Sequence, residues 1–300
     1  MGPVQQAGGE AVPRRRTGTA LAGWGVFPYT GTMTDATGPR RPTPWMEFAA
    51  AVIFLTRVPI PWRKDWPADL DQRAMSWFPI VGALIGGAGG ALYWVAAQAG
   101  LPPVLSGLVA LAGLIWLTGA LHEDGLADVA DGFGGGRDRA AKLEIMKDSR
   151  VGTYGAAALV LSVLARGAAL SAIGAPREVA LALIGAHAWS RGLLPALKYA
   201  LPSARPGGVA DRQGRPNSAR AVAAFVVGLT LAATAIGEMN LGSGAAGLSI
   251  LLLSGAGVAV LARLATRQVG GVTGDVLGAA QQVAETLFLV AAVAALGSAA

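Results

Sequence analysis

Residues 104–136 read VLSGLVALAGLIWLTGALHEDGLADVADGFGGG, an uncharged apolar run that passes directly into closely spaced acids. The acidic part extends to Gly155, and the segment 122–155 holds seven of the chain's 18 acidic residues. A helix of about 20 apolar residues crosses a membrane, whereas a carboxylate in lipid is strongly unfavourable. We therefore expect membrane helices on both sides of a polar segment, and we expect the chemistry in that segment.

The composition of the whole chain agrees with a membrane protein. Its 300 residues are 53% hydrophobic and 14% charged, with a mean hydropathy of +0.50, whereas an ordinary soluble domain has about 25% charged residues. The absence of cysteine excludes disulfides and thiolate chemistry, and two histidines are too few for a histidine-rich zinc centre. The net charge of +6 resides in short segments between apolar runs, as in cytoplasmic loops, so no nucleic-acid partner is expected.

Apolar runs define the expected spans, because a membrane helix needs about 20 mostly apolar residues. The piece from Phe48 to Leu55 is too short to cross alone and is expected to be re-entrant, interfacial or completed by its flanks. Seven longer runs lie near residues 77–98, 104–121, 154–174, 179–199, 221–237, 243–263 and 279–298. The sequence therefore predicts an all-α, polytopic helical membrane protein with about seven full spans plus one short amino-terminal apolar segment.

The loops between the expected spans differ in positive charge. One alternate set carries fifteen Lys and Arg side chains, whereas the opposite set, 99–103, 175–178 and 238–242, carries only Arg177. Because cytoplasmic loops are enriched in Lys and Arg, we expect the basic set on the cytoplasmic side of the inner membrane. That set comprises residues 63–73, 122–153, 198–220 and 263–275, and it includes the acidic segment.

The amino-terminal residues 1–45 differ from the rest in being rich in Gly, Pro, Thr and Arg. No long apolar run lies beside the basic residues 14–16, so these residues do not read as a signal peptide. We expect a disordered extension over residues 1–45 and a single membrane-embedded catalytic domain over residues 46–300.

Three aspartates in the acidic segment are spaced as on one helical face. Asp124, Asp128 and Asp131 are four and three residues apart, which places them within roughly 60° of one another on a helix. Like charges this close raise each other's proton affinity unless a cation joins them. Mg²⁺ is the expected cation, since it prefers oxygen ligands and is usually bound by a few carboxylates together with substrate phosphates. The alternative is a solvated helix end at a membrane surface.

Four glycines follow these aspartates, at Gly132, Gly134, Gly135 and Gly136. Glycine permits positive φ and disfavours a continuing helix, so we expect the run to end the helix. The resulting loop would let backbone amides approach an anion, and Gly134 and Gly135 are predicted substrate contacts.

Basic residues follow the glycines. Arg137, Lys147 and Arg150 are predicted to bind a diphosphate, because fixed positive charge suits phosphate oxygens. The alternative is ordinary ion pairing with the neighbouring acids on an amphipathic surface helix.

Carboxylates, a glycine-rich turn and basic side chains are together typical of phosphoryl-group chemistry, in which metal ions bridge phosphate oxygens. The residues alone allow two kinds of transferase at the membrane surface. One would move a phosphoalcohol from a nucleotide diphosphate, and the other would move a prenyl group from a diphosphate.

The acidic segment also carries a family resemblance. The stretch LHEDGLADVADGFGG from Leu121, continued by EIMKDSRVGTYG from Glu144, resembles the signature of the cobalamin synthase family, the adenosylcobinamide-GDP ribazoletransferases. The resemblance runs from about residue 46 to the carboxyl end. Three further pieces are similar to the same family in order, FLTRVP at 54–59, WFPIVG at 77–82 and GGVTGDVLGA at 270–279.

The resemblance implies a polytopic membrane enzyme that needs Mg²⁺. Its substrates would be adenosylcobinamide-GDP and α-ribazole or α-ribazole 5′-phosphate, and it would release GMP in the last assembly step of the cobalamin nucleotide loop. Neither the preferred form of ribazole, nor the number of metals, nor the oligomeric state follows from the sequence.

The expected site residues have three kinds of role. Asp124, Asp128 and Asp131 are predicted metal ligands, and Glu123 is predicted as a fourth ligand or as a base for the attacking hydroxyl. Asp275 would hold a second metal or a substrate hydroxyl, unless it caps the last helix. The complete predicted substrate-binding set is Arg57, Gly134, Gly135, Arg137, Lys147, Arg150 and Asp275.

Two other functions remain as alternatives. A small-molecule transporter would use polar residues inside the membrane, and Arg166, His187 and Arg191 lie within expected spans, although no internal repeat is evident. A CDP-alcohol phosphotransferase-like enzyme would also use spaced aspartates. Its usual D-G-x2-A-R spacing is absent, because no arginine stands at the expected place after Asp124 and Gly125.

Overall fold

The computed structural model describes residues 42–62, 67–239, 241 and 243–297. The extension expected over residues 1–45 lies almost entirely outside these described residues. Within them the chain is helical and contains no strand beyond one isolated bridge, so the predicted all-α membrane fold is confirmed. The helices are α1 (Pro44–Leu55), α2 (Leu70–Ala74), η1 (Met75–Trp77), α3 (Phe78–Gln98), α4 (Pro103–Thr118), α5 (Leu121–Gly135), α6 (Arg139–Ile145), α7 (Thr153–Ile173), α8 (Pro176–Ala200), α9 (Val209–Arg212), α10 (Ser218–Glu238), α11 (Gly244–Val269) and α12 (Gly274–Gly297).

The number of membrane-spanning helices is smaller than the seven expected. Five segments of the described chain are long and apolar enough to cross a membrane: Leu70–Gln98, which ends in α3, and α7, α10, α11 and α12. α4 has only 16 residues and reaches span length only together with α5, although the pair is bent by 89°. The helix α1 is short and apolar, as expected.

The expected span at 179–199 belongs to α8, which is too polar to qualify. His187, Arg191 and Lys198 lie on this helix, and all three side chains are buried. Neighbouring helices cover α8, with α3 and α10 its most extensive partners. Because protein surrounds α8, its buried polar residues lower its hydropathy below that of a lipid-facing span, although its 25 residues are long enough to cross a membrane.

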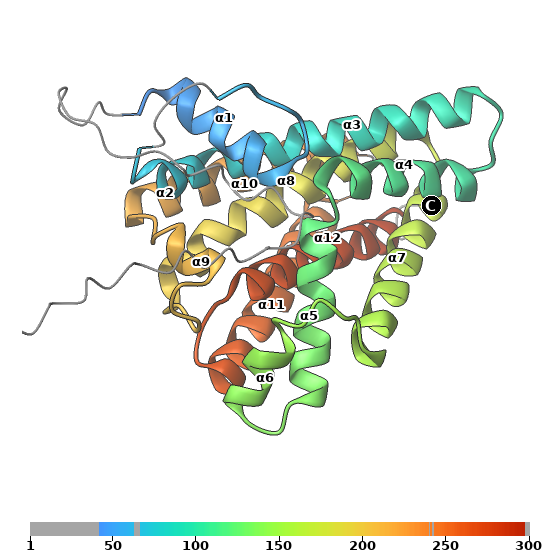
Figure 1. The fold of residues 1–300 in the computed structure, drawn as a ribbon. Coiled ribbons are helices and arrows are strands. Elements are labelled where there is room, and N and C mark those ends of the chain that lie inside the picture. Colours follow the sequence, from blue (N-terminus) through green and yellow to red (C-terminus); the bar gives the residue numbers. More distant parts are fainter. Residues whose placement is uncertain (1–41, 63–66, 240, 242, 298–300) are drawn as a thin grey trace, which may run out of the picture. The chain divides into compact units, whose positions relative to one another are not determined.

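A sharp bend joins α4 to α5. Gly119 and Ala120 both adopt left-handed backbone conformations, with φ of 65° and 57°, and Ala120 is the one non-glycine residue with positive φ in the described chain. Glycine takes this conformation readily, whereas alanine does so at an energetic cost. Figure 1 shows α5 turning away from α4 at this point, so the polar helix leaves the direction of the apolar one.

The helix α5 packs closely against α12. A Cβ atom on Gly125 would lie 2.7 Å from the backbone oxygen of Asp275, and one on Gly278 would lie 3.3 Å from Cα of His122. Glycine is needed at 125 because the two backbones approach closely there. This contact sets the aspartate face of α5 beside the start of α12.

A second long-range contact brings the segment after α8 to the same place. The Ala204 amide donates to the Val272 carbonyl at 2.8 Å, and the Val272 amide donates to the Pro202 carbonyl at 2.9 Å. The residue after Ala204 is therefore held close to the loop that precedes α12.

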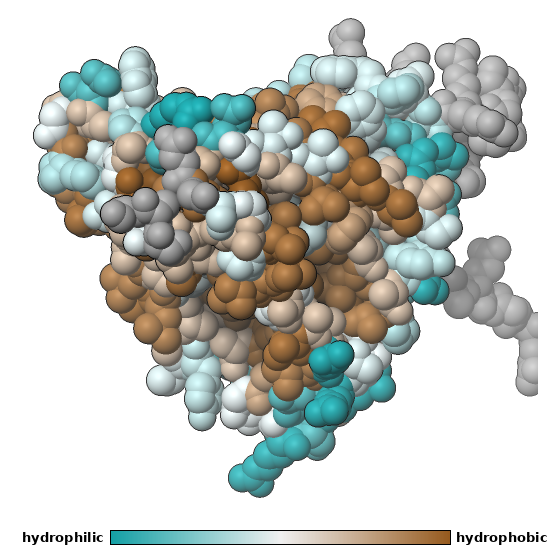
Figure 2. Space-filling model, turned by 180° about the vertical axis from the view of Figure 1, so that it is seen from behind, coloured by the Kyte–Doolittle hydropathy of each residue, from teal (hydrophilic) through white to brown (hydrophobic). Residues whose placement is uncertain are grey.

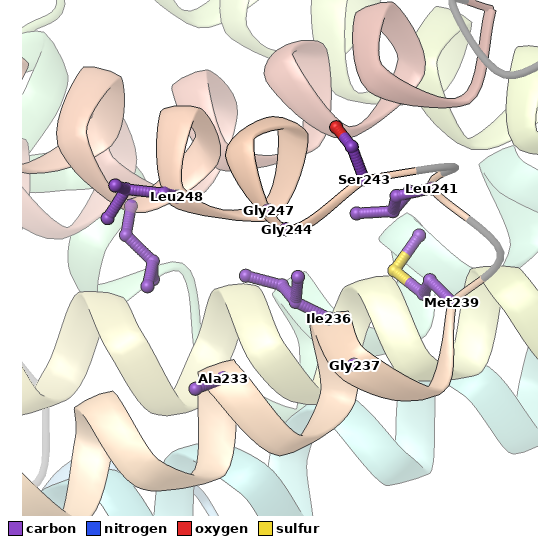
Figure 3. Close-up of a pocket in the computed structure, with 10 residues that line it drawn as sticks. Ala233, Ile236, Gly237, Met239, Leu241, Ser243, Gly244, Gly247 and Leu248 are labelled. Atoms are coloured by element: carbon purple, nitrogen blue, oxygen red, sulfur yellow. The ribbon is translucent and has the colours of Figure 1, made fainter.

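The surface has the apolar character of a membrane protein. Figure 2 shows hydrophobic residues spread over much of one face, with hydrophilic residues gathered toward its edges. Figure 3 shows a cavity of about 510 Å³ between α10 and α11, with Ile236, Met239, Leu241 and Leu248 on its walls. The described residues that line this cavity include none of the predicted site residues.

Candidate active site

The acidic segment forms the helix α5, as its aspartate spacing predicted. Asp124, Asp128 and Asp131 therefore lie along one face, with Asp124 exposed and the other two half-buried. α5 is too polar to cross the membrane alone and is not one of the five spanning segments.

Asp128 has the most perturbed carboxyl group on this face. Burial raises its pKa first, and the charges of Asp124 and Asp275 raise it further, to about 8, against the opposing charge of Arg205. A carboxyl with this pKa holds a proton near neutral pH unless a cation replaces it. We refer to Asp124, Asp128 and Asp275 as the aspartate cluster.

Asp275 enters the cluster from the first turn of α12. Its Oδ2 accepts a hydrogen bond from the Thr273 hydroxyl at 3.2 Å and lies 3.5 Å from Nη1 of Arg205. Thr273 also accepts from the Val276 amide at 3.1 Å, so it provides the amino-terminal cap of α12. The alternative that Asp275 caps this helix is therefore wrong, and its carboxylate is free to face α5.

Asp131 makes different contacts from the other two aspartates of α5. Its Oδ2 accepts from the Gly152 amide at 2.7 Å, and its Oδ1 accepts from the Gly155 amide at 2.8 Å. Both oxygens thus anchor the start of α7, whose first amides have no partner within the helix. Its role as a metal ligand remains a prediction, and these contacts provide a structural function for the same carboxylate.

The aspartate cluster suits Mg²⁺ in one particular way. In the part of the chain that the structure describes, no three carboxylate or imidazole groups converge closely enough to enclose a cation by themselves. Mg²⁺ usually keeps several waters and takes one or two carboxylates plus substrate phosphates, so a closed protein cage is not required. Asp128 has the required chemistry, because it is a hard oxygen donor among like charges that a cation would neutralise.

Glu123 points into the interior of the bundle. Its Oε1 accepts from both terminal nitrogens of Arg166 at 3.2 Å and from the Gln282 side chain at 3.1 Å, whereas its Oε2 is buried without a hydrogen bond. The structure therefore does not bring Glu123 to the aspartates. Its predicted role as a ligand or base is not favoured by this position.

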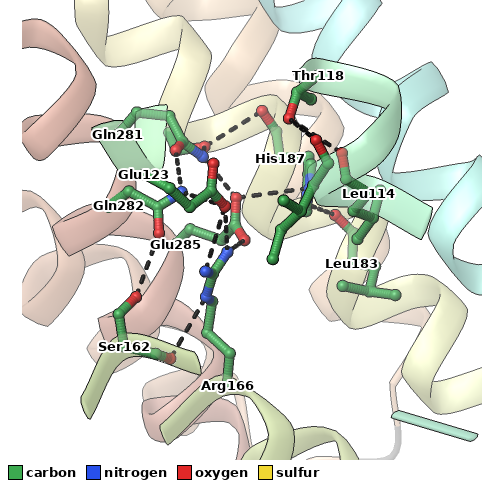
Figure 4. A network of polar contacts seen from close by, with 12 residues as sticks. Leu114, Thr118, Glu123, Ser162, Arg166, Leu183, His187, Gln281, Gln282 and Glu285 are labelled. Carbon is green, nitrogen blue, oxygen red and sulfur yellow. Dashed lines mark hydrogen bonds and ion pairs between the residues drawn. The ribbon is translucent and has the colours of Figure 1, made fainter. Parts of the chain in front are cut away.

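Glu123 belongs to a buried network centred on Glu285 of α12. Glu285 lies 2.9 Å from Nη1 of Arg166 and 3.5 Å from both Nη1 of Arg191 and Nε2 of His187. Figure 4 shows Glu123, Arg166, His187 and Glu285 converging from α5, α7, α8 and α12. We call Glu123, Arg166, His187, Arg191 and Glu285 the interior network; its two acids and two arginines balance. The basic side chains within expected spans that suggested a transporter are thus paired with two buried glutamates.

The glycine run does not form the predicted loop. α5 continues to Gly135, and none of its glycines, nor Gly136, has a positive φ. Close packing explains them instead: a Cβ on Gly132 would lie 2.5 Å from the Met146 side chain, and one on Gly134 would lie 2.7 Å from the Tyr154 ring. The helix ends within this run, as predicted, but without the expected positive φ. Substrate contact at Gly134 and Gly135 remains a prediction.

Two of the predicted diphosphate contacts pair with neighbouring acids. Lys147 lies 3.2 Å from Glu144, and Arg150 lies 2.6 Å from Asp148, all at the surface. This is the ion-pair alternative that the sequence left open. Arg137 is exposed beside the end of α5.

Arg57 lies at the bend between α4 and α5. Its backbone amide donates to the Leu117 carbonyl at 2.8 Å, and its side chain covers Gly119, whose added Cβ would lie 2.9 Å from it. Arg57 thus stands next to the start of α5, and its role in substrate binding remains a prediction.

Comparisons with known proteins identify the relatives of this chain. Residues 47–293 match the family model described as cobalamin-5-phosphate synthase. The chain belongs to this family. The match covers α5, most of α12 and all residues of the aspartate cluster and the interior network.

Individual members of the synthase family are similar over most of their length. The chain is 47% identical over 244 residues to an adenosylcobinamide-GDP ribazoletransferase of Bradyrhizobium diazoefficiens, which covers 81% of this chain and 92% of the relative. It is 42% identical over 258 residues to one from Mesorhizobium japonicum (84% and 94%) and 44% identical over 253 residues to one from Azorhizobium caulinodans (81% and 93%). No solved structure matches. The chain is therefore an enzyme of this family, as its acidic motif predicted.

Arg205 is a site residue that the sequence did not single out. It counted only as one of fifteen basic residues in the expected cytoplasmic loops, 70 positions from Asp275 in the chain. No local pattern marks it, because its position depends on the pairing of Ala204 with Val272. Its guanidinium is nevertheless the positive charge that most opposes the raised pKa of Asp128.

Proposed function

We propose that this protein joins adenosylcobinamide-GDP to α-ribazole or α-ribazole 5′-phosphate and releases GMP, the last assembly step of the cobalamin nucleotide loop. The reaction would take place at the cytoplasmic face of the inner membrane and would depend on Mg²⁺. The relatives are named adenosylcobinamide-GDP ribazoletransferase, and this chain matches them over nearly their whole length. The observation that carries the mechanism is the aspartate cluster, three carboxylates of which one has a pKa raised to about 8.

Asp128 would bind the cation together with Asp124 or Asp275. Bound Mg²⁺ supplies positive charge to phosphate oxygens and so lowers the cost of the charge that builds up on the leaving group. The aspartates hold that charge in place from two helices, α5 and α12, which Gly125 keeps in close contact. The cluster thereby fixes where a diphosphate must lie.

The transfer exchanges one phosphorus–oxygen bond for another. The ribazole hydroxyl forms a bond to the phosphorus attached to cobinamide, and the bond between that phosphorus and the bridging oxygen breaks. GMP leaves with the electron pair, and the hydroxyl proton passes to water or to a carboxylate of the cluster. Positioning and charge neutralisation dominate such reactions, which fits a site made of carboxylates rather than of a strong nucleophile.

A turnover assay tests this function. Purified protein in detergent should release GMP from adenosylcobinamide-GDP and α-ribazole with Mg²⁺, and chelation of divalent cations should stop the release. Asp128→Asn should abolish turnover while the protein stays in the membrane fraction. Asp69→Asn is the matched control, because Asp69 pairs at the surface with Arg73. Near-normal GMP release by Asp128→Asn would overturn the assignment, and a wild type that forms no cobalamin product would overturn the function.

The orientation of the protein has a separate test. The chain has no cysteine, so single cysteines can be labelled without background. Arg212 and Glu238 are both exposed and lie in opposite sets of loops. A membrane-impermeant thiol reagent should label Arg212→Cys only from the cytoplasmic side and Glu238→Cys only from the other side; the reverse pattern would contradict the proposed active face.

A further inference from the structure

Arg205 lies in the segment between α8 and α9, outside every motif of the acidic segment. The segment is held by hydrogen bonds from Ala204 to Val272 and from Val272 to Pro202. Nη2 of Arg205 also donates to the Leu143 carbonyl of α6 at 3.0 Å. The side chain is thus fixed between α6 and α12 rather than extended into solvent, with only 20% of its surface exposed.

The guanidinium has unused binding capacity. Nη1 is 3.5 Å from the Asp275 carboxylate, which is long for a charge-assisted hydrogen bond, since these are about 2.7–2.9 Å. Nε is buried and has no hydrogen-bond partner. A buried donor without an acceptor is unfavourable, and an acceptor that reached Nε would satisfy it.

The charges around this guanidinium explain what such an acceptor could be. The carboxylate of Asp275 lies 3.5 Å from Arg205, and the charges of both residues act on Asp128. A divalent cation at the aspartate cluster would take over the neutralisation of Asp275 and release the guanidinium. The guanidinium would then offer its unpartnered Nε and the released Nη1 to phosphate oxygens, while Nη2 keeps its bond to Leu143.

We propose that Arg205 contacts the substrate directly and binds a phosphate oxygen of the diphosphate, while Asp275 holds the guanidinium in position before substrate arrives. This proposal rests on the proposed function, because it names the residue that recognises the diphosphate of that reaction. It also divides the site into two parts: the aspartates bind the cation and Arg205 binds the anion.

Kinetics of Arg205 variants test the proposal. Arg205→Gln should raise the KM for adenosylcobinamide-GDP by about 10- to 100-fold, the loss expected for hydrogen bonds between charged groups. The KM for α-ribazole should stay within about twofold, and Arg205→Lys should recover part of the loss because it restores charge but not the paired donors. Arg212→Gln is the matched control, since Arg212 is an exposed residue of the same inter-helix segment.

A second measurement separates a substrate contact from a structural role. If Arg205 only balances Asp275, its removal should strengthen Mg²⁺ binding and leave the KM for the diphosphate substrate unchanged, which would overturn the proposal. Equal increases in both KM values, or a loss of thermal stability shared by Arg205→Lys, would overturn it too.

Measuring the binding of inorganic pyrophosphate in the presence of Mg²⁺ tests the role of Arg205 independently of the proposed function. Calorimetry should show pyrophosphate binding to the wild type and to Arg212→Gln, and at least tenfold weaker binding to Arg205→Gln. A wild type that forms no cobalamin product yet shows this difference would refute the proposed function alone. Equal pyrophosphate affinity in Arg205→Gln and the wild type would refute the role of Arg205 alone.

Discussion

The molecule holds two groups of acidic side chains on the same two helices, and the two groups differ in how their charge is balanced. In the interior network, Glu123 of α5 and Glu285 of α12 are matched by Arg166 and Arg191 at 2.9–3.5 Å. In the aspartate cluster, Arg205 lies 3.5 Å from Asp275, and its charge acts on Asp128 against the charges of Asp124 and Asp275.

This difference separates structure from chemistry within one helix pair. Buried charges with an opposite partner hold helices together, and breaking such a pair is strongly destabilising. Carboxylates that lack partners keep a raised pKa and a capacity for cations. Each turn of α5 therefore contributes to two tasks, with its inner face joined to the network and its outer face presenting the cluster.

After Asp128→Asn, which should abolish turnover, the largest expected effect comes from Asp275→Asn. The amide keeps an acceptor for the Thr273 hydroxyl but removes one charge of the cluster, so GMP release should fall on the order of 100- to 1,000-fold. Thermal stability should fall by no more than about 1 kcal/mol, because the partly exposed ion pair with Arg205 is lost. Turnover close to that of the wild type would show that α5 alone binds the cation.

Glu285→Gln should instead act on stability. It leaves Arg166 and Arg191 buried without their main counter-charge, which costs about 3–5 kcal/mol. Thermal unfolding in detergent measures this loss, and Glu238→Gln serves as the control because it removes an exposed carboxylate paired with Arg177. A stable Glu285→Gln protein with an altered Mg²⁺ requirement would remove the distinction between the two groups.

Gly125→Ala tests the contact that places the two groups. The added methyl would lie 2.7 Å from the Asp275 backbone oxygen, so α5 and α12 must separate, at a cost of about 1–3 kcal/mol. GMP release should fall together with stability. Gly237→Ala is the control, because nothing lies within 4 Å of its added methyl; equal behaviour of the two variants would argue that the close contact does not position the cluster.

Asp131→Asn should have the smallest effect on turnover. It tests whether Asp131 stabilises the fold or binds the cation. An amide replaces a carboxylate that accepts from the Gly152 and Gly155 amides, so about 1–2 kcal/mol of stability should be lost. The Mg²⁺ concentration for half-maximal turnover should change little. A large increase in that concentration would instead confirm the ligand role that the helical spacing predicted.

The sequence predicted the parts of the site that are periodic. The spacing of Asp124, Asp128 and Asp131 predicted a helix with one acidic face, and the structure confirms it. Glu123 could have been separated from this face, because adjacent helix residues differ by about 100° in direction. The family motif supplied Asp275, and its position beside α5 supports the grouping.

Other features depend on tertiary contacts that no local pattern reveals. Arg205 reaches the cluster through backbone pairing between residues 202–204 and 272. The glycines of α5 fit close packing against Met146 and Tyr154 rather than a loop. The polar residues of α8 are covered by α3 and α10, so this helix need not be as apolar as a lipid-facing span.

The central claim is that the unbalanced aspartates, and not the balanced interior acids, bind the divalent cation. Mn²⁺ can replace Mg²⁺ as a spectroscopic probe, because both prefer oxygen ligands. Electron paramagnetic resonance of the purified protein with inorganic pyrophosphate should show bound Mn²⁺ in the wild type and in Glu238→Gln, and at least tenfold weaker binding in Asp128→Asn. Unchanged Mn²⁺ affinity in Asp128→Asn would contradict the account.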